Sequence, residues 1–256
     1  MKISLRHKEE LDDERFARML AQSPAEAARA ILAAATQNVV QAQALLGQIL
    51  LDGRGIERDE ALARRWFEIA ANQGDAMARN MLGRCLEHGW GGAVDVTAAA
   101  QHYRLAAQAE LDWGLYNFAN LLATGRGIAQ DNGRALNCYR QAAQLGHAKS
   151  MNLLGRYLEQ GLHCTPDREA AAQWYRRSAE AGDFRGQFSH AAVLADQGLI
   201  EQAVVWLRKA LAGGNLNFLR VSTQALLQAG HAQIRAIAQE YQARLLELES
   251  QANINL

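Results

Sequence analysis

Residues 42–74 read AQALLGQILLDGRGIERDEALARRWFEIAANQG, and related stretches follow at a fixed spacing along the chain. The glycine that ends the first apolar run, Gly53, recurs every 36 residues at Gly89, Gly125 and Gly161. A fixed period of this length is typical of stacked supersecondary units, each of which buries its apolar face against its neighbours. The sequence therefore predicts a repeat array of helices rather than a single enzyme core.

Three sets of positions recur inside the predicted units. A small residue recurs in the first helix, at Gly47, Gly83, Ala119, Gly155 and Ala191. An alanine recurs in the second helix, at Ala63, Ala99, Ala135, Ala171 and Ala203. A pair that is bulky in most units follows this alanine, as Trp66-Phe67, His102-Tyr103, Cys138-Tyr139, Trp174-Tyr175 and Trp206-Leu207. The last two pairs are only 32 residues apart, so the fifth unit is predicted to be shorter than the others.

The recurring positions have a direct physical interpretation. Two antiparallel helices approach closely only where one has a very small side chain, so Gly47 and Ala63 are predicted to mark their crossing. The bulky residues that follow are predicted to fill the gap between one hairpin and the next, with His102 and Cys138 in core positions. The repeated Gly-x-Gly is interpreted as a helix-ending turn with positive φ, not as a phosphate loop, because it follows no strand.

The repeated pattern is Ala-x-x-x-Leu-Gly, then Gly-x-Gly-Ile, then Ala-x-x-Trp-Phe-x-x-Ala-Ala-x-x-Gly. It resembles the Sel1-like repeat, a relative of the tetratricopeptide repeat, and the period of 36 favours it over the ordinary 34-residue unit. The resemblance implies an all-α fold, a right-handed α/α superhelix or solenoid of about five helix hairpins. We predict these hairpins over residues 40–75, 76–111, 112–147, 148–183 and 184–215. The signature residues are Gly47, Ala63, Trp66, Gly83, Ala99, Ala135, Gly155, Ala171, Trp174, Ala203 and Trp206.

Helical caps are predicted at both ends of the array. Residues 1–39 are expected to form a degenerate repeat, with one helix over 8–22 and a second that starts at Ser23-Pro24. Ser23 is predicted to supply a capping oxygen and Pro24 the first helical position. Residues 216–256 contain a helical face on which Ile234, Ile237, Ala238, Tyr241 and Leu245 align. This face is predicted to cover the core of the last repeat, with a dimerisation stripe as the alternative.

Composition excludes several classes of function. Lys plus Arg and Asp plus Glu each number 27, and this zero net charge disfavours nucleic acid as a partner. No segment approaches the roughly 20 uncharged apolar residues of a membrane span, and the first residues lack a signal-peptide core. The three cysteines, Cys85, Cys138 and Cys164, are an odd number at unrelated spacings, which suggests reduced thiols. We therefore expect a cytoplasmic, soluble protein.

The sequence gives little support for a catalytic site or a metal-binding site. Cys85 and His88 are three apart, and a second His–Cys pair occupies 163–164, but zinc sites need four ligands and show paired close spacings. Cys85 also falls on an otherwise apolar column, so it is predicted to be a core residue. No metal, cofactor or catalytic residue is predicted. Cys164, in a turn, is the thiol expected to be most exposed and oxidisable.

A partner-binding face is predicted on the first helices, because the related tetratricopeptide geometry implies that these helices line the concave side of the array. The candidates are Gln48, Asn80, Arg84, Glu87, Trp113, Tyr116, Asn120, Asn152, Arg156, Glu159, Phe188 and His190. Asparagine can bond a peptide backbone, arginine can clamp a carboxylate, and aromatic residues supply anchoring area. The alternative is a solvated face on which Arg84–Glu87 and Arg156–Glu159 form surface pairs.

The function predicted from these features is that of a non-catalytic adaptor or scaffold. The array would bind a partner protein or peptide in its concave groove, with a monomer favoured as the oligomeric state. A regulatory or assembly subunit of a specific enzyme complex is the main alternative. An enzyme that depends on a metal or a thiol is the least favoured hypothesis, since no set of residues supports it.

Overall fold

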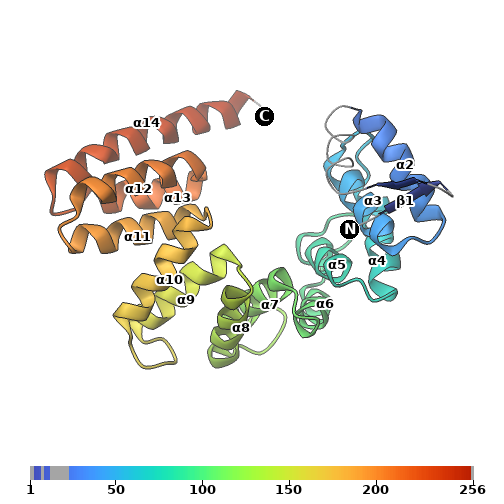
Figure 1. Cartoon of the computed structure of the whole chain (residues 1–256), viewed down its shortest axis with the longest axis horizontal. Coiled ribbons are helices and arrows are strands. Elements are labelled where there is room, and N and C mark those ends of the chain that lie inside the picture. The colour runs from blue at the N-terminus through green and yellow to red at the C-terminus, as the bar shows by residue number, and fades with distance from the viewer. Residues whose placement is uncertain (1–2, 7–8, 12–22, 255–256) are drawn as a thin grey trace. The chain divides into compact units, whose positions relative to one another are not determined.

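The computed structural model describes residues 3–6, 9–11 and 23–254 (Figure 1). A short antiparallel hairpin, β1 (Ile3–Arg6) and β2 (Glu9–Leu11), precedes a series of helices. The helices are α2 (Pro24–Thr36), α3 (Val40–Asp52), α4 (Glu60–Asn72), α5 (Ala76–His88), α6 (Val96–Gln108), α7 (Asp112–Thr124), α8 (Asn132–Gln144), α9 (Ala148–Gln160), α10 (Arg168–Glu180), α11 (Phe184–Asp196), α12 (Ile200–Gly213), α13 (Leu216–Leu227) and α14 (Ala232–Ile254). Apart from the short hairpin, the predicted all-α fold of helix hairpins is confirmed. The chain forms two compact units, Met1–Ala135 and Leu136–Leu256.

The ends of the helices recur with the period of the sequence. In the first four repeats the second helix starts at an aspartate whose carboxylate accepts a hydrogen bond from the backbone N–H three residues later, as at Asp59 (2.8 Å) and Asp95 (2.9 Å). This contact satisfies one of the backbone donors that a helix start leaves unpaired. The first helix of each of these four repeats ends at a glycine with positive φ, 67° at Gly53 and 76° at Gly89, whereas α11 of the fifth repeat is capped by Gln197. The predicted glycine turns are therefore confirmed.

In three of the hairpins the core contains a contact between a glycine of the first helix and a ring of the second. A Cβ added at Gly47 would lie 2.7 Å from the ring of Phe67, and one at Gly83 would lie 2.7 Å from the ring of Tyr103. Real Cβ atoms do not approach so closely, so only glycine fits at these positions without a shift of the ring. The ring joins the predicted small residues at the crossing, since a Cβ at Gly83 would also lie 3.3 Å from the Ala99 carbonyl oxygen.

The two members of each bulky pair differ in burial, contrary to the prediction that the first member belongs to the core. The second members are at most 3% exposed, namely Phe67, Tyr103, Tyr139, Tyr175 and Leu207. The first members, including His102 and Cys138, are only half-buried. Two of the tryptophans lie instead beneath cations of their own helices, with Arg177 4.3 Å from the Trp174 ring and Lys209 3.9 Å from the Trp206 ring.

The N-terminal cap departs from the sequence prediction in two ways. The expected helix over 8–22 is wrong at its start, because Glu9–Leu11 is a strand, and residues 12–22 lie outside the described part. Ser23 makes no capping bond through its side chain, and its backbone carbonyl accepts from the N–H groups of Glu26 and Ala27 instead. Pro24 does occupy the start of α2, where its missing N–H removes no helical hydrogen bond.

The C-terminal helices close the second unit as predicted. Ile234, Ile237, Ala238 and Tyr241 of α14 are buried in one cluster with residues of α11, α12 and α13. Figure 1 shows α11, α12 and α14 lying side by side in this unit. The hydroxyl of Tyr241 donates to the Leu207 carbonyl at 2.6 Å, which satisfies the polar end of a ring that is otherwise surrounded by apolar groups. Because this face is already buried, it does not serve as a dimerisation stripe.

We predict that Gly83→Val destabilises the fold by about 1–3 kcal/mol, because the added atoms displace the Tyr103 ring. The free energy of unfolding, measured by urea denaturation, checks this value. Gly133→Ala is the matched control, since a Cβ at this helical position meets only one atom, at 3.6 Å. It should be neutral or slightly stabilising. An equal loss of stability in both variants would contradict the packing argument.

Candidate functional site

Successive first helices are tied together by buried amide contacts. In the first unit, Asn117 of α7 donates through Nδ2 to Oδ1 of Asn80 on α5 at 2.8 Å. In the second unit, the Ser189 hydroxyl of α11 donates to Oδ1 of Asn152 on α9 at 2.9 Å. Asn80 is 2% and Asn152 8% exposed. The prediction that these two asparagines face an open groove is therefore wrong, because both are used inside the structure.

The accessible surface of the first helices in the unit Met1–Ala135 is formed by side chains other than these two asparagines. We call this surface the first-helix face, and it comprises Gln48, Met77, Arg84, Trp113, Tyr116 and Asn120 of α3, α5 and α7. Met77 is 44% and Trp113 38% exposed, although both are large and apolar. The Trp113 and Tyr116 rings pack edge to face, with centroids 6.1 Å apart. The face therefore combines apolar anchors with amide and guanidinium groups.

A cavity of about 260 Å³ opens between α3 and α5 on this face. Its lining consists of Gln41, Ala44, Leu45, Gln48, Phe67, Asp75, Met77 and Met81. The polar groups at its edge have partners within the chain: the Gln48 amide donates to Asp52, and Asp75 accepts from the Ala78 N–H. The open space is thus bounded mainly by apolar carbon and sulfur, which suits an apolar side chain of a partner.

Met77 was missed by the sequence prediction, although a signal for it was present. It stands one period of 36 residues before Trp113, which the sequence analysis did select. Methionine at this position was not distinguished from a core residue, because periodicity alone does not tell how much of a side chain is covered. Only the positions of the neighbouring helices leave it exposed.

The acidic candidates are held by contacts inside the chain. Glu87 accepts a hydrogen bond from the Tyr103 hydroxyl at 2.7 Å and pairs with Arg126 at 3.0 Å. Glu159 likewise accepts from the Tyr175 hydroxyl at 2.8 Å. Burial is the main cause that raises the pKa of both tyrosines, and the bond to the carboxylate raises it further. These glutamates join the two helices of a hairpin, a role that the sequence analysis did not identify.

The arginine candidates differ in their surroundings. The Arg84 guanidinium lies 4.9 Å from the Trp90 ring and 3.8 Å from the sulfur of Met81, so its position is fixed by its neighbours. Arg156, on α9 of the second unit, is exposed. Both carry a charge that a partner could reach. A guanidinium held against an indole ring loses less conformational entropy when it binds a carboxylate.

Two candidates of the second unit are half-buried and pack against neighbouring rings. Phe188 packs edge to face against Phe218, with ring centroids 5.7 Å apart, and belongs to the C-terminal core. The His190 ring lies 5.3 Å from Trp206, so it is directed toward the second helix of its hairpin. Burial is the main cause that lowers the pKa of His190, and nearby Arg176 lowers it further. The predicted groove position of His190 is therefore wrong, whereas Phe188 also lines a cavity of about 240 Å³ with Ala192 and Leu226.

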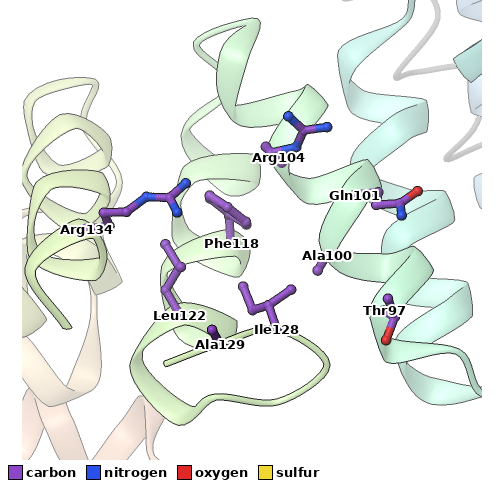
Figure 2. A pocket seen from close by; sticks show the side chains of 9 residues that line it. All are labelled: Thr97, Ala100, Gln101, Arg104, Phe118, Leu122, Ile128, Ala129 and Arg134. Atoms are coloured by element: carbon purple, nitrogen blue, oxygen red, sulfur yellow. The ribbon is translucent and has the colours of Figure 1, made fainter. Parts of the chain in front are cut away.

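A second cavity, of about 250 Å³, lies elsewhere in the first unit (Figure 2). We call it the α6–α7 cavity, and its lining consists of Thr97, Ala100, Gln101, Arg104, Phe118, Leu122, Ile128, Ala129 and Arg134. Figure 2 shows the apolar side chains of Phe118, Leu122 and Ile128 between the two helices, with Arg104 and Arg134 near the Phe118 end. The sequence analysis did not anticipate this cavity.

Comparison with known protein families identifies the type of repeat from which the array is built. The Sel1 repeat family matches residues 40–75, 76–111, 114–147, 148–183 and 194–215, which is more than half of the chain. The chain belongs to the Sel1 repeat family. The resemblance inferred from its sequence is therefore confirmed. Sel1 repeat arrays are commonly scaffolds for protein interaction and generally lack enzymatic activity.

Solved structures with the same fold include two at more than a quarter sequence identity. A protective antigen present in uropathogenic Escherichia coli strains is 28% identical, with a TM-score of 0.69 over 91% of this chain and 52% of that one. The chain thus spans about half the length of this antigen. A Sel1 repeat protein from Oxalobacter formigenes is 26% identical, with a TM-score of 0.75 over 90% and 94% of the two chains. An immunity protein from Pseudomonas aeruginosa, at 14% identity and a TM-score of 0.53 over 81% of each chain, shares the fold. No curated protein matches the chain.

The cysteines of this Sel1 repeat protein differ in accessibility. Cys85 is fully buried, and burial raises the pKa of its thiol to about 11. Cys164, predicted to be the most exposed thiol, is half-buried, as is Cys138, and its thiol donates to the Tyr157 carbonyl at 3.5 Å. Within the described ranges, no three His, Cys, Asp or Glu side chains group as a metal site. None of the helices placed by the structure is both long and apolar enough to cross a membrane.

We predict that the amide tie between α5 and α7 contributes about 1 kcal/mol of coupling between Asn80 and Asn117. A double-mutant cycle with Asn80→Ala, Asn117→Ala and the double variant, followed by urea unfolding, measures this coupling. Asn72→Ala, at an exposed helical position, is the control and should change stability little. Additive effects of the two single variants would show that the tie contributes nothing.

We also predict that alkylation at pH 8 modifies Cys164 well before Cys85 in the native protein. A thiol with a pKa of about 11 is ionised to roughly one part in a thousand at this pH, and the buried sulfur is shielded from the reagent. Peptide mapping by mass spectrometry after timed exposure to iodoacetamide checks the order. Urea should abolish the protection of Cys85, and rapid native labelling of Cys85 would contradict its placement.

Proposed function

We propose that this protein is a non-catalytic adaptor that binds a partner polypeptide on the first-helix face. The observation that carries the proposal is the apolar cavity between α3 and α5, which opens beside the exposed side chain of Met77. Trp113, one period further along, provides a second anchor of the same kind on α7. Apolar anchors beside an open cavity are the features that concentrate binding energy at protein interfaces.

The composition of the face supports a peptide or protein as the partner rather than a small molecule. Methionine adapts its shape to different apolar side chains, and tryptophan supplies a large rigid surface with few rotatable bonds. Gln48, Arg84 and Asn120 surround these anchors with groups that can bond a backbone or a carboxylate. Met77 and Trp113 differ from singly exposed apolar residues because both stand at the same position of successive first helices, and Met77 also lines the cavity.

The proposal extends to the second unit through the exposed guanidinium of Arg156, which stands three periods after Gln48, two after Arg84 and one after Asn120. It does not depend on any particular arrangement of the two units. We also propose a reducing compartment such as the cytoplasm, supported by the free thiols of Cys85 and Cys164.

The proposal is tested by affinity capture from a lysate of the source organism, with the native chain and a Met77→Ala/Trp113→Ala variant as baits. We expect the variant to retain the principal partner at least about tenfold more weakly, because both anchors are lost. Ile69→Ala is the matched control, since Ile69 is 41% exposed on α4, the second helix of the first hairpin. Circular dichroism verifies that all three proteins are folded.

The identity of the captured protein then separates the two forms of the hypothesis. A captured enzyme whose activity changes on binding would indicate a regulatory or assembly subunit, and a non-enzymatic partner would indicate an adaptor. Equal retention by the native chain and the Met77→Ala/Trp113→Ala variant would refute the first-helix face as the binding surface.

A further inference from the structure

The α6–α7 cavity lies beside a repeat position whose side chain varies in size along the chain, with alanine at Ala28, Ala100 and Ala172. Ala100 stands where Arg64 stands one period earlier and Leu136 one period later. In the preceding repeat, the Arg64 guanidinium lies directly against Gly92, the equivalent of Ile128. The long side chain of Arg64 therefore occupies a space that Ala100 leaves open. The Arg64–Gly92 contact of the preceding repeat is thus replaced here by Ala100 and Ile128, both of which line the cavity.

The chemistry of the cavity is apolar inside and cationic at one end. Phe118, Leu122 and Ile128 supply its apolar lining, and no acidic residue contributes to it. Arg104 and Arg134 lie near the Phe118 end in Figure 2, and the Arg134 guanidinium is 5.8 Å from the centre of that ring.

The two cations are poorly neutralised by the chain itself. Among the described residues, Arg134 has a single ionic contact, in which its Nε lies 4.0 Å from Oδ2 of Asp131, at the outer limit of an ion pair. Over the part of the chain that the structure describes, Arg104 pairs with no acidic side chain. Two guanidinium groups beside an apolar cavity attract a carboxylate that is attached to an apolar group, because each part then meets its complement.

We propose that the α6–α7 cavity binds the C-terminal residue of a partner polypeptide. The apolar side chain of that residue would enter the space left by Ala100, and its α-carboxylate would lie between Arg104 and Arg134. A C-terminal residue carries both groups on one Cα, so both reach the same cavity, whereas an internal acidic residue would also have to bring a continuing chain past the opening. A volume of about 250 Å³ suits one apolar side chain rather than a larger ligand. This site is separate from the first-helix face and does not rest on the function proposed for it.

The test uses fluorescein-labelled hexapeptides that end in leucine, isoleucine, valine, methionine or phenylalanine. Each peptide is prepared with a free C-terminal carboxylate and as the C-terminal amide, and binding to the full chain is followed by fluorescence polarisation. We expect at least one free acid to bind, and its amide to bind at least about tenfold more weakly. Arg104→Gln and Arg134→Gln should each weaken binding of the acid without changing the weak binding of the amide. Arg168→Gln, an exposed charge change in α10, should leave binding of the acid unchanged.

The cavity itself is tested by Ala100→Leu, which introduces the residue found one period later. This variant should abolish binding of the free acid, and circular dichroism establishes whether it is folded. The arginine variants keep the proposal testable if Ala100→Leu fails to fold. Three results would each overturn the proposal: no free acid binds at millimolar concentration, acid and amide bind equally, or a peptide with an internal aspartate and an amidated end binds as tightly as the acid.

Discussion

The contact between a glycine of the first helix and an aromatic ring of the second sets the geometry of the hairpins. At Gly47, Gly83 and Gly155, a Cβ would meet the ring of the facing aromatic residue at 2.6–2.7 Å. The ring can enter the hairpin only because the opposite position has no side chain, and it then buries a large apolar area in a small space. The hydroxyl groups of Tyr103 and Tyr175 reach through to a glutamate near the end of the first helix. One ring thus fixes both the separation of the two helices and the alignment of their ends.

The same geometry decides which side chains remain for function. The aromatic ring occupies the interior of the hairpin, and Asn80 and Asn152 make the hydrogen bonds that tie successive first helices together. Apart from the partners of these two residues, the other polar side chains of the first helices do not take part in these contacts. Met77 and Trp113 are left exposed on the first-helix face. At Ala100, the loss of a long side chain that the preceding repeat provides opens a cavity without disturbing the ring contact. A repeat array can therefore vary single positions to create binding sites while its core stays constant.

Much of the fold could be predicted from the sequence, because its determinants recur at a fixed spacing and act locally. The period of 36 located the hairpins, and glycines such as Gly53 located the ends of first helices through their positive φ. The candidate site was harder to predict. Of the residues expected on the groove, Arg84 and Trp113 are accessible, whereas Asn80 is buried and His190 is directed toward Trp206. The sequence gives the helical position of a side chain, but not the neighbour that covers it.

The amino-acid sequence by itself determined the repeat, the helix ends and the small-and-bulky pattern of the core, since each depends on residues within one period. Tertiary structure alone decided which member of a bulky pair is buried, that Asn80 meets Asn117, and that a cavity lies beside Ala100. These outcomes depend on how side chains from different helices fit against one another. That fit is set by the distance and rotation between packed helices, and a one-dimensional period does not contain either quantity.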